Sequence, residues 1–234
     1  MCEHKANNYF PGQIDTNAHC FKFGDIMNLL KPFHHSHLVE AGCDEAGRGC
    51  FAGPVFAAAV ILPADFYHPL LNDSKQVVPE IRAELRSYIE IHAIDFAVEK
   101  VSNEEIDEIN ILRASFKAMH LALKKLKKQP EFLLIDGHLF YKYQKIPHLC
   151  VIKGDGIYAS IAAASILAKT YRDDYMQQLH SEFPQYGWFN NKGYGTPEHR
   201  RGIELHGLCN YHRKSFHITP AQLPLFEKKS IEST

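Results

Sequence analysis

The feature that most constrains the fold is the alternation of short apolar runs with longer amphipathic segments. The apolar runs have strand length and cover residues 38–43, 55–62, 96–101, 132–136 and 149–152. Segments with helical periodicity or helix-start signals cover residues 79–92, 102–126 and 160–183. The chain begins with two consecutive strands and continues with strands that alternate with helices. This order predicts an α/β layer fold with a mixed sheet.

Size and charge exclude several classes of protein. A chain of 234 residues suits one large domain, and no apolar run approaches the roughly 20 residues of a membrane-spanning helix. The formal net charge of -1 excludes a protein whose whole surface binds polyanions. Contact with nucleic acid must therefore come from local clusters, such as residues 192–217 with their excess of Lys and Arg over Glu.

Cysteine usage and the N-terminus predict a cytoplasmic protein. The six cysteines form no C-x-x-C pair, and most lie in apolar or glycine-rich stretches where free thiols behave as small hydrophobes. The first residues lack the apolar core of a secretory signal and the Arg and Ser of a transit peptide. We also expect residues 1–36, which are polar and aperiodic, to form a poorly structured extension.

Four carboxylates stand where apolar runs give way to glycine: Asp44, Glu45, Asp136 and Asp155. Neighbouring residues of a strand face opposite sides, so Glu45 shares a site with Asp44 only if it already belongs to the turn. Gathered carboxylates repel one another unless cations neutralise them, and oxygen ligands alone select Mg²⁺ or Mn²⁺. Two such ions about 4 Å apart activate water and stabilise a leaving oxygen, so the pattern favours hydrolysis of phosphodiesters. Any one of the four alone would be interpreted as a turn-former or helix cap.

An ordered series of motifs resembles that of the ribonuclease HII family. It spans roughly Leu38 to Phe216 and comprises Asp44-Glu45-Ala46-Gly47-Arg48-Gly49, Ala52-Gly53-Pro54-Val55, Asn72-Asp73-Ser74-Lys75, Leu134-Ile135-Asp136-Gly137, Lys153-Gly154-Asp155, Ala163-Ala164-Ser165-Ile166-Leu167-Ala168-Lys169 and Lys192-Gly193-Tyr194. The resemblance implies a ribonuclease H-like fold with a five-stranded mixed sheet and a C-terminal helical portion. It implies that Asp44, Glu45, Asp136 and Asp155 are the catalytic, metal-binding carboxylates, with two Mg²⁺ or Mn²⁺ ions present when substrate is bound.

The same resemblance implies the substrate and its contacts. The family cuts the RNA strand of RNA–DNA hybrids and nicks duplex DNA 5′ to an embedded ribonucleotide, as in ribonucleotide excision repair, leaving a 3′-hydroxyl and a 5′-phosphate. Gly47, Arg48 and Gly49 match the element whose backbone reads the ribose 2′-hydroxyl, and Tyr194 matches the tyrosine at the ribo-to-deoxyribo junction. Lys75 is a weaker candidate for a phosphate contact, and Lys169 and Asp173 are expected to form a helix-surface ion pair.

Two alternatives remain open from the sequence. A type 3 ribonuclease H would act only on hybrids, but its extra N-terminal domain does not fit in the 43 residues before Asp44. A non-catalytic nucleic-acid-binding module would gain from losing negative charge near phosphates, yet all four carboxylates are present. We therefore expect a monomeric endoribonuclease with its catalytic domain over residues 37–217.

The tail, residues 218–234, carries a separate signal. Residues Gln222 to Phe226 read Gln-Leu-Pro-Leu-Phe and resemble the short peptide by which many bacterial replication and repair proteins dock on the sliding clamp. Leu and Phe anchors on an extended peptide suit an apolar pocket. A tail that packs on its own domain is the alternative, and the sequence leaves both open.

Overall fold

The structure is a computed structural model and describes residues 30–72 and 77–217. Its centre is a five-stranded sheet of order β3-β2-β1-β4-β5. The strands are β1 (Glu40–Ala46), β2 (Val55–Ile61), β3 (Asp95–Val101), β4 (Phe132–Asp136) and β5 (His148–Val151). β1 pairs antiparallel with β2 and parallel with β4, so the sheet is mixed, which confirms the expected fold class.

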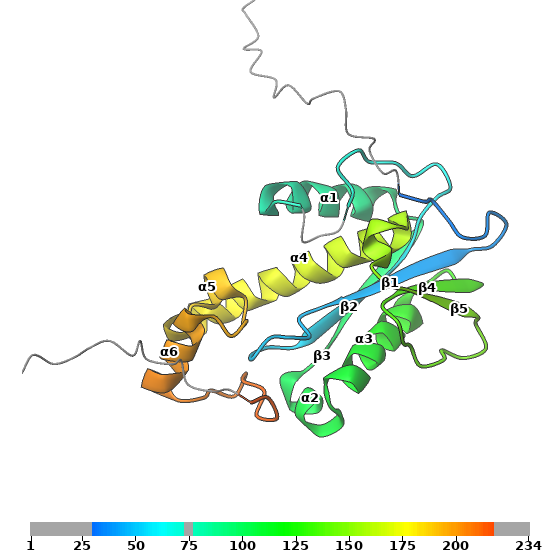
Figure 1. Cartoon of the computed structure of the whole chain (residues 1–234). Helices are drawn as coiled ribbons and strands as arrows, with labels where there is room; N and C mark the ends of the chain where they lie inside the picture. Colours follow the sequence, from blue (N-terminus) through cyan, green and yellow to red (C-terminus); the bar gives the residue numbers. More distant parts are fainter. Residues whose placement is uncertain (1–29, 73–76, 218–234) are drawn as a thin grey trace, which may run out of the picture.

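Helices cover both faces of the sheet (Figure 1). One face carries α3 (Ile111–Lys125), preceded by the short α2 (Asn103–Ile109), and the other carries α4 (Ala159–Glu182) with α1 (Pro79–His92) packed on it. Ser102 caps α2 by accepting a hydrogen bond from the Glu105 N–H at 3.2 Å, as its sequence predicts. The two apolar layers on either side of β1 and β2 form the core of the protein.

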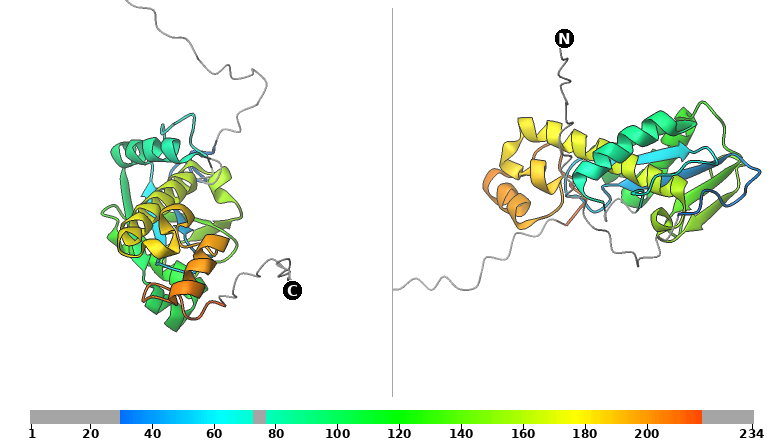
Figure 2. Two further views of the ribbon diagram at one scale, coloured as in Figure 1. Left: turned by 90° about the vertical axis from the view of Figure 1, so that its left-hand side faces the viewer. Right: turned by 90° about the horizontal axis from the view of Figure 1, so that it is seen from above.

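The helix α4 connects the sheet to a C-terminal helical portion. Its first half is almost entirely buried because alanines let it approach the strands closely, whereas its second half extends past the sheet. It is followed there by η2 (Pro184–Tyr186), α5 (Trp188–Asn191) and α6 (Pro197–His206). Figure 2 shows these helices gathered at one end of α4, beyond the strands. The expected C-terminal helical portion is therefore confirmed.

Part of the expected N-terminal extension is held against the domain. The Lys31 N–H donates to the Ile157 carbonyl at 2.7 Å, and the Ala159 N–H donates to the Lys31 carbonyl at 2.9 Å. These bonds attach residues near position 31 to the start of α4. Residues 1–29 lie outside the described part of the chain.

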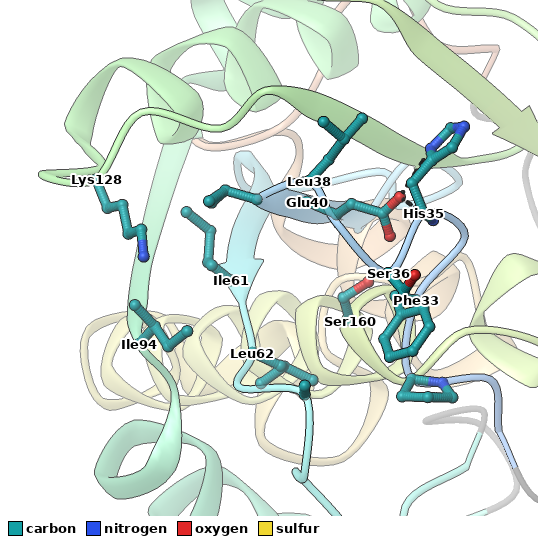
Figure 3. Close-up of a pocket in the computed structure, with 13 residues that line it drawn as sticks. Phe33, His35, Ser36, Leu38, Glu40, Ile61, Leu62, Ile94, Lys128 and Ser160 are labelled. Atoms are coloured by element: carbon teal, nitrogen blue, oxygen red, sulfur yellow. Dashed lines mark hydrogen bonds and ion pairs between the residues drawn. The ribbon is translucent and has the colours of Figure 1, made fainter.

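A cavity of about 160 Å³ lies at the start of β1, where the chain enters the sheet (Figure 3). The buried Glu40 carboxylate there accepts hydrogen bonds from the N–H groups of His34 and His35, at 2.8 and 2.7 Å. The Ser160 hydroxyl also lines this cavity and has no hydrogen-bond partner among the described residues. Because Asp44 lies four residues further along β1, this cavity is separate from the acidic end of the strand.

No helix within residues 30–72 and 77–217 combines the length and apolarity needed to cross a membrane.

Candidate active site

The parallel pairing of β1 with β4 brings two of the carboxylates to one edge of the sheet. Cys43 lies opposite Ile135 in this pairing, so the next residues, Asp44 and Asp136, follow side by side. Asp44 is buried, and Asp136 is the last residue of β4 and half-buried. The carboxyl ends of parallel strands are where α/β proteins place their sites, and both carboxylates lie at such an end.

The Asp44 carboxylate is electrostatically disfavoured in its charged form. Burial raises its pKa well above the usual range, and the charges of Glu45 and Asp136 raise it further. Hydrogen bonds from the Ser165 side chain and from the Glu45 N–H, the latter at 2.7 Å, oppose this effect. Three carboxylates therefore interact at one place, which is the condition that a bound cation relieves.

Asp155 is connected to this group through the backbone of its neighbour. It lies buried in the 3₁₀ turn η1 (Gly154–Gly156), which follows β5 after two intervening residues. The Gly154 N–H donates to the Asp136 carboxylate at 2.8 Å. The turn that carries Asp155 is thus tied to the end of β4.

Glu45 differs from the sequence expectation. It does not belong to the turn but continues β1, paired with Ala57. Strand alternation alone would turn it away from Asp44, yet its carboxylate bends toward the loop and accepts a hydrogen bond from the Arg48 guanidinium at 3.0 Å. Glu45 still lies close enough to Asp44 for its charge to raise the pKa of that carboxyl.

The donor set suits a hard divalent cation. Asp44, Glu45 and Asp136 offer only oxygen atoms, and their mutual repulsion favours binding of positive charge. In the described part of the chain, however, no three His, Cys, Asp or Glu side chains already enclose a point where an ion fits. Arg48 and the Gly154 N–H engage two of the carboxylates instead. An ion that used all three would therefore require these side chains to rearrange.

The loop that follows β1 requires glycine at its first position. Gly47 has φ +97, and a Cβ at this position would lie 2.0 Å from the Arg172 Nε, so only glycine fits. Beyond it, Arg48 and Gly49 are exposed, and Cys50 forms an isolated bridge with Tyr194. The two expected substrate-contacting elements, Gly47–Arg48–Gly49 and Tyr194, are therefore neighbours.

Tyr194 is 43% exposed, which is high for a large aromatic residue. The Phe51 N–H donates to the Gly193 carbonyl at 2.8 Å, and this bond holds the Tyr194 loop against the Gly47–Gly49 loop. The Arg172 guanidinium lies 6.0 Å from the centre of the Tyr194 ring. An exposed ring with a fixed backbone is available to stack on a ligand.

Two buried arginines, Arg172 and Arg213, hold the Gly47–Gly49 loop and the Tyr194 loop in place. Neither was predicted as a site residue. Arg172 of α4 donates to the carbonyls of Ala52, Pro54 and Lys192 at 2.8–3.2 Å. Arg213 donates to the carbonyls of Gly47, Arg48 and Gly53 at 2.7–3.0 Å. Arg172 lies three residues after the motif that ends at Lys169, whereas nothing in a single sequence distinguishes Arg213 from a solvated cation.

The remaining sequence predictions have different outcomes. The Lys169–Asp173 ion pair is confirmed, with Nζ to Oδ1 at 2.7 Å. Lys75 and the Gln222–Phe226 peptide lie outside the described residues. Ser165 was quoted within a motif without a role, and its hydrogen bond to Asp44 now gives it one.

Two buried histidines, His199 and His212, form a hydrogen-bond network that holds the backbone of the Tyr194 loop. His199 Nδ1 donates to the Tyr194 carbonyl at 2.9 Å, so its Nε2 accepts from Trp188 Nε1–H at 3.0 Å and from His212 Nε2–H at 3.1 Å. His212 Nδ1 in turn accepts from the Cys209 N–H at 3.0 Å. A proton added to either ring would place two donors against each other.

We expect this network to make the protein less stable in acid. Burial, followed by the neighbouring His199, lowers the pKa of His212 from 6.5 to about 4. The unfolded state then binds the proton more tightly, so stability is complete above pH 6.5 and falls as the pH drops toward 4. Urea unfolding should show that, between about pH 7.5 and pH 5, the wild type loses about 2 kcal/mol more than His212→Gln does. Equal losses in the two proteins would contradict the buried neutral pair.

Comparison with known proteins gives the family. The model of the Ribonuclease HII family matches residues 41–219. A ribonuclease HII of Bacteroides fragilis is 61% identical over 201 residues, which cover 86% of this chain and 100% of the relative. A ribonuclease HII of Porphyromonas gingivalis is 56% identical over 200 residues, with 85% and 100% coverage.

Solved structures agree with this result. The ribonuclease H2 of Pyrococcus horikoshii superposes with a TM-score of 0.67 at 25% identity, covering 76% of this chain and 94% of that one. The RNase HII in a PCNA:RNase HII complex from Archaeoglobus fulgidus gives 0.67 at 26%, with 81% and 100% coverage. A Bst-RNase HIII solved with Mn²⁺ has the same fold, at 22% identity and a TM-score of 0.61.

The mixed sheet, the acidic strand ends and these relatives define a nuclease of the ribonuclease H class, an endoribonuclease that hydrolyses phosphodiester bonds. Within that class, the chain belongs to the ribonuclease HII family. The type 3 alternative is not supported as a family assignment, because the matching family is HII over nearly the whole described domain.

Proposed function

We propose that this protein cleaves the RNA strand of RNA–DNA hybrids and nicks duplex DNA on the 5′ side of an embedded ribonucleotide, leaving a 3′-hydroxyl and a 5′-phosphate. The observation that carries the proposal is the juxtaposition of the acidic strand ends with an exposed glycine loop. Asp44 and Asp136 interact at the sheet edge, and Glu45 contacts Arg48 of that loop at 3.0 Å. The carboxylates would thus lie at the scissile phosphate while the adjacent loop contacts the neighbouring sugar.

The carboxylates of Asp44, Glu45, Asp136 and Asp155 are the proposed ligands of two Mg²⁺ or Mn²⁺ ions. When bound, such ions polarise the phosphodiester and lower the pKa of an attacking water. The protein's own part is to hold the carboxylates close together at the cost of mutual repulsion, with Ser165 fixing Asp44 and the Gly154 N–H fixing Asp136. This support keeps the ligand oxygens in place between turnovers.

Recognition of the ribonucleotide is assigned to backbone and aromatic groups. Gly47, Arg48 and Gly49 allow the backbone to approach a sugar closely, and the 2′-hydroxyl is the group that distinguishes RNA from DNA. Tyr194 is proposed to pack on the deoxyribose at the ribo-to-deoxyribo junction, supported by its exposed ring. Lys75 remains a proposed phosphate contact.

The test is a gel assay on a DNA duplex that carries one ribonucleotide, with Mg²⁺, with Mn²⁺ and with chelator. The proposal expects metal-dependent nicking on the 5′ side of that ribonucleotide. Cleavage confined to an all-RNA strand in a hybrid would reassign the specificity to long hybrids. Loss of cleavage on both substrates would leave a nucleic-acid-binding module.

Tyr194→Ala should lower cleavage at a single ribonucleotide more than cleavage of a long hybrid. On a long hybrid the ring has no unique junction to contact, whereas at a single ribonucleotide the junction fixes the register. Loss of one stacked base or sugar costs about 1–3 kcal/mol, so we expect roughly a ten-fold or larger difference between the two substrates. Comparison of kcat/KM on both substrates checks this, and equal losses would count against the junction role.

The setting of the activity is also proposed. We place the enzyme in the cytoplasm as a monomer that acts in ribonucleotide removal from DNA, and the four cysteines within the described residues are all free thiols, as in a reducing compartment.

We further propose that Gln222–Phe226 docks on the sliding clamp, an interaction for which the PCNA:RNase HII complex of a relative provides support. Leu225→Ala and Phe226→Ala should each reduce retention on immobilised clamp protein, because each removes an apolar anchor. Retention equal to that of the wild type would remove the idea.

A further inference from the structure

Arg213 is a buried cation, and within residues 30–72 and 77–217 its guanidinium donates hydrogen bonds to backbone carbonyls alone. Its side chain is fully buried, and its Nε, Nη1 and Nη2 donate to the carbonyls of Gly53, Arg48 and Gly47 at 3.0, 2.8 and 2.7 Å. Asp107, a carboxylate whose charge acts on Arg213, is hydrogen-bonded instead to the N–H groups of Lys214 and Ser215. A buried charge without a direct carboxylate partner is costly, so its position calls for an explanation.

Its contacts determine which way two peptide groups point. The Gly47 carbonyl shares a peptide group with the Arg48 N–H, and the Arg48 carbonyl shares one with the Gly49 N–H. In a trans peptide the C=O and the N–H point in opposite directions. Because Arg213 draws both carbonyls toward the interior, the Arg48 and Gly49 N–H groups turn outward, where both residues are exposed.

Arg213 is itself fixed by contacts that do not involve these two peptide groups. Its own N–H donates to the Phe51 carbonyl at 2.8 Å, and its guanidinium lies 5.1 Å from the centre of the Phe216 ring. The following residues, Lys214 and Ser215, are anchored by Asp107 at 2.9 Å each. The Arg213 guanidinium is therefore held in place independently of the two carbonyls that it orients.

We propose that Arg213 is a positioning residue for ribonucleotide recognition: its guanidinium holds the carbonyls of Gly47 and Arg48 inward so that the N–H groups of Arg48 and Gly49 face the ribose. This inference rests on the proposed function, because it explains how the amides that are proposed to recognise the 2′-hydroxyl are oriented. It also explains why a segment more than 160 residues away in the chain belongs to the site.

A purely structural role predicts something different. If Arg213 only stabilised the fold, its replacement would lower thermal stability, DNA binding and cleavage together. Positioning of the two amides predicts a selective loss, because the attraction of the protein for the phosphate backbone does not pass through this buried group. The two roles are therefore separable by measurement.

The test uses Arg213→Lys in the full chain. Lysine keeps the charge, but its single ammonium cannot hold three carbonyls in a planar fork. We expect kcat/KM on the single-ribonucleotide duplex to fall about a hundred-fold, mostly in kcat, while the Kd for an all-DNA duplex of the same sequence is unchanged. Arg86→Lys is the matched control, because Arg86 also makes several hydrogen bonds but to Glu90 and Asp174 on α1 and α4. It should retain cleavage.

Two results would overturn the inference: unchanged cleavage by folded Arg213→Lys, or cleavage and all-DNA binding that fall in parallel. If Arg213→Lys does not fold, the Asp136→Asn protein with the native arginine and ¹⁵N-labelled glycine replaces it. The Gly49 amide resonance should then shift with the single-ribonucleotide duplex and not with the all-DNA duplex, and identical shifts would overturn the inference. Wild type that does not cleave at all would instead reject the proposed function.

Discussion

Asp136→Asn should abolish cleavage while leaving the protein folded. Asparagine keeps the size of the side chain and an oxygen that can accept the Gly154 N–H, whose bond now measures 2.8 Å. It removes the negative charge that a divalent cation would use, so we expect a loss of about a thousand-fold or more in kcat in the gel assay. The same change relieves repulsion of Asp44, whose pKa Asp136 raises. Thermal unfolding should therefore show equal or slightly higher stability.

Asp95→Asn is the control for this experiment. Asp95 begins β3 at the other end of the sheet, opposite Ile61, and its carboxylate accepts hydrogen bonds from the N–H groups of Lys127 and Lys128. Its replacement should cost some stability and no cleavage. Substantial cleavage by Asp136→Asn, or equal losses in the two variants, would show that the charge at the end of β4 is not needed.

Gly42→Ala should destabilise the protein by about 3 kcal/mol or more and take activity with it. A Cβ at Gly42 would lie 2.2 Å from the Ser160 carbonyl carbon and 2.5 Å from the Ile161 nitrogen. These are backbone atoms of the first turn of α4, so no side-chain rotation relieves the clash. Separation of β1 from α4 would move Asp44, which lies on β1, away from Asp155, which lies just before α4. The carboxylates would then no longer be held at one site.

Urea unfolding compares Gly42→Ala with Gly156→Ala. A Cβ at Gly156 meets no atom within 4 Å, and its φ is not in the left-handed region. The control should therefore change the free energy of unfolding by no more than about 0.5 kcal/mol. A Gly42→Ala protein as stable as this control would mean that the close contact between β1 and α4 is not needed.

The ranges of the five strands and of the long helices α1 and α4 could be predicted closely from the sequence, whereas the break between α2 and α3 and the ranges of α5 and α6 could not. The run 55–62 became β2 (Val55–Ile61), and the helical segment 160–183 became α4 (Ala159–Glu182). Hydrophobic periodicity and breakers such as Pro63 and Pro79 are local, so they can be identified in a single chain. The clearest miss was Glu45, because a strand end depends on how far the partner strand continues.

Part of the candidate site was also visible in advance. Carboxylates that follow apolar runs mark strand ends, and glycines around Arg48 mark a loop that needs an open backbone. Their convergence was not visible, since it depends on the parallel register of β1 with β4, set by side-chain packing between layers. That the Gly47 loop and Tyr194 would be neighbours followed only from the family resemblance, because no local pattern connects the two segments.

By itself, the sequence therefore determined the elements of this protein and the chemistry at their ends, through local patterns of apolar, charged and glycine residues. Only the tertiary structure decided how that chemistry is supported. Arg213 meets the Gly47 carbonyl 166 residues away, and Ser165 meets Asp44 across the gap between helix and sheet. Hydrogen bonds from a side chain to a distant carboxylate or carbonyl impose no periodicity on either segment, so they become visible only when the chain is folded.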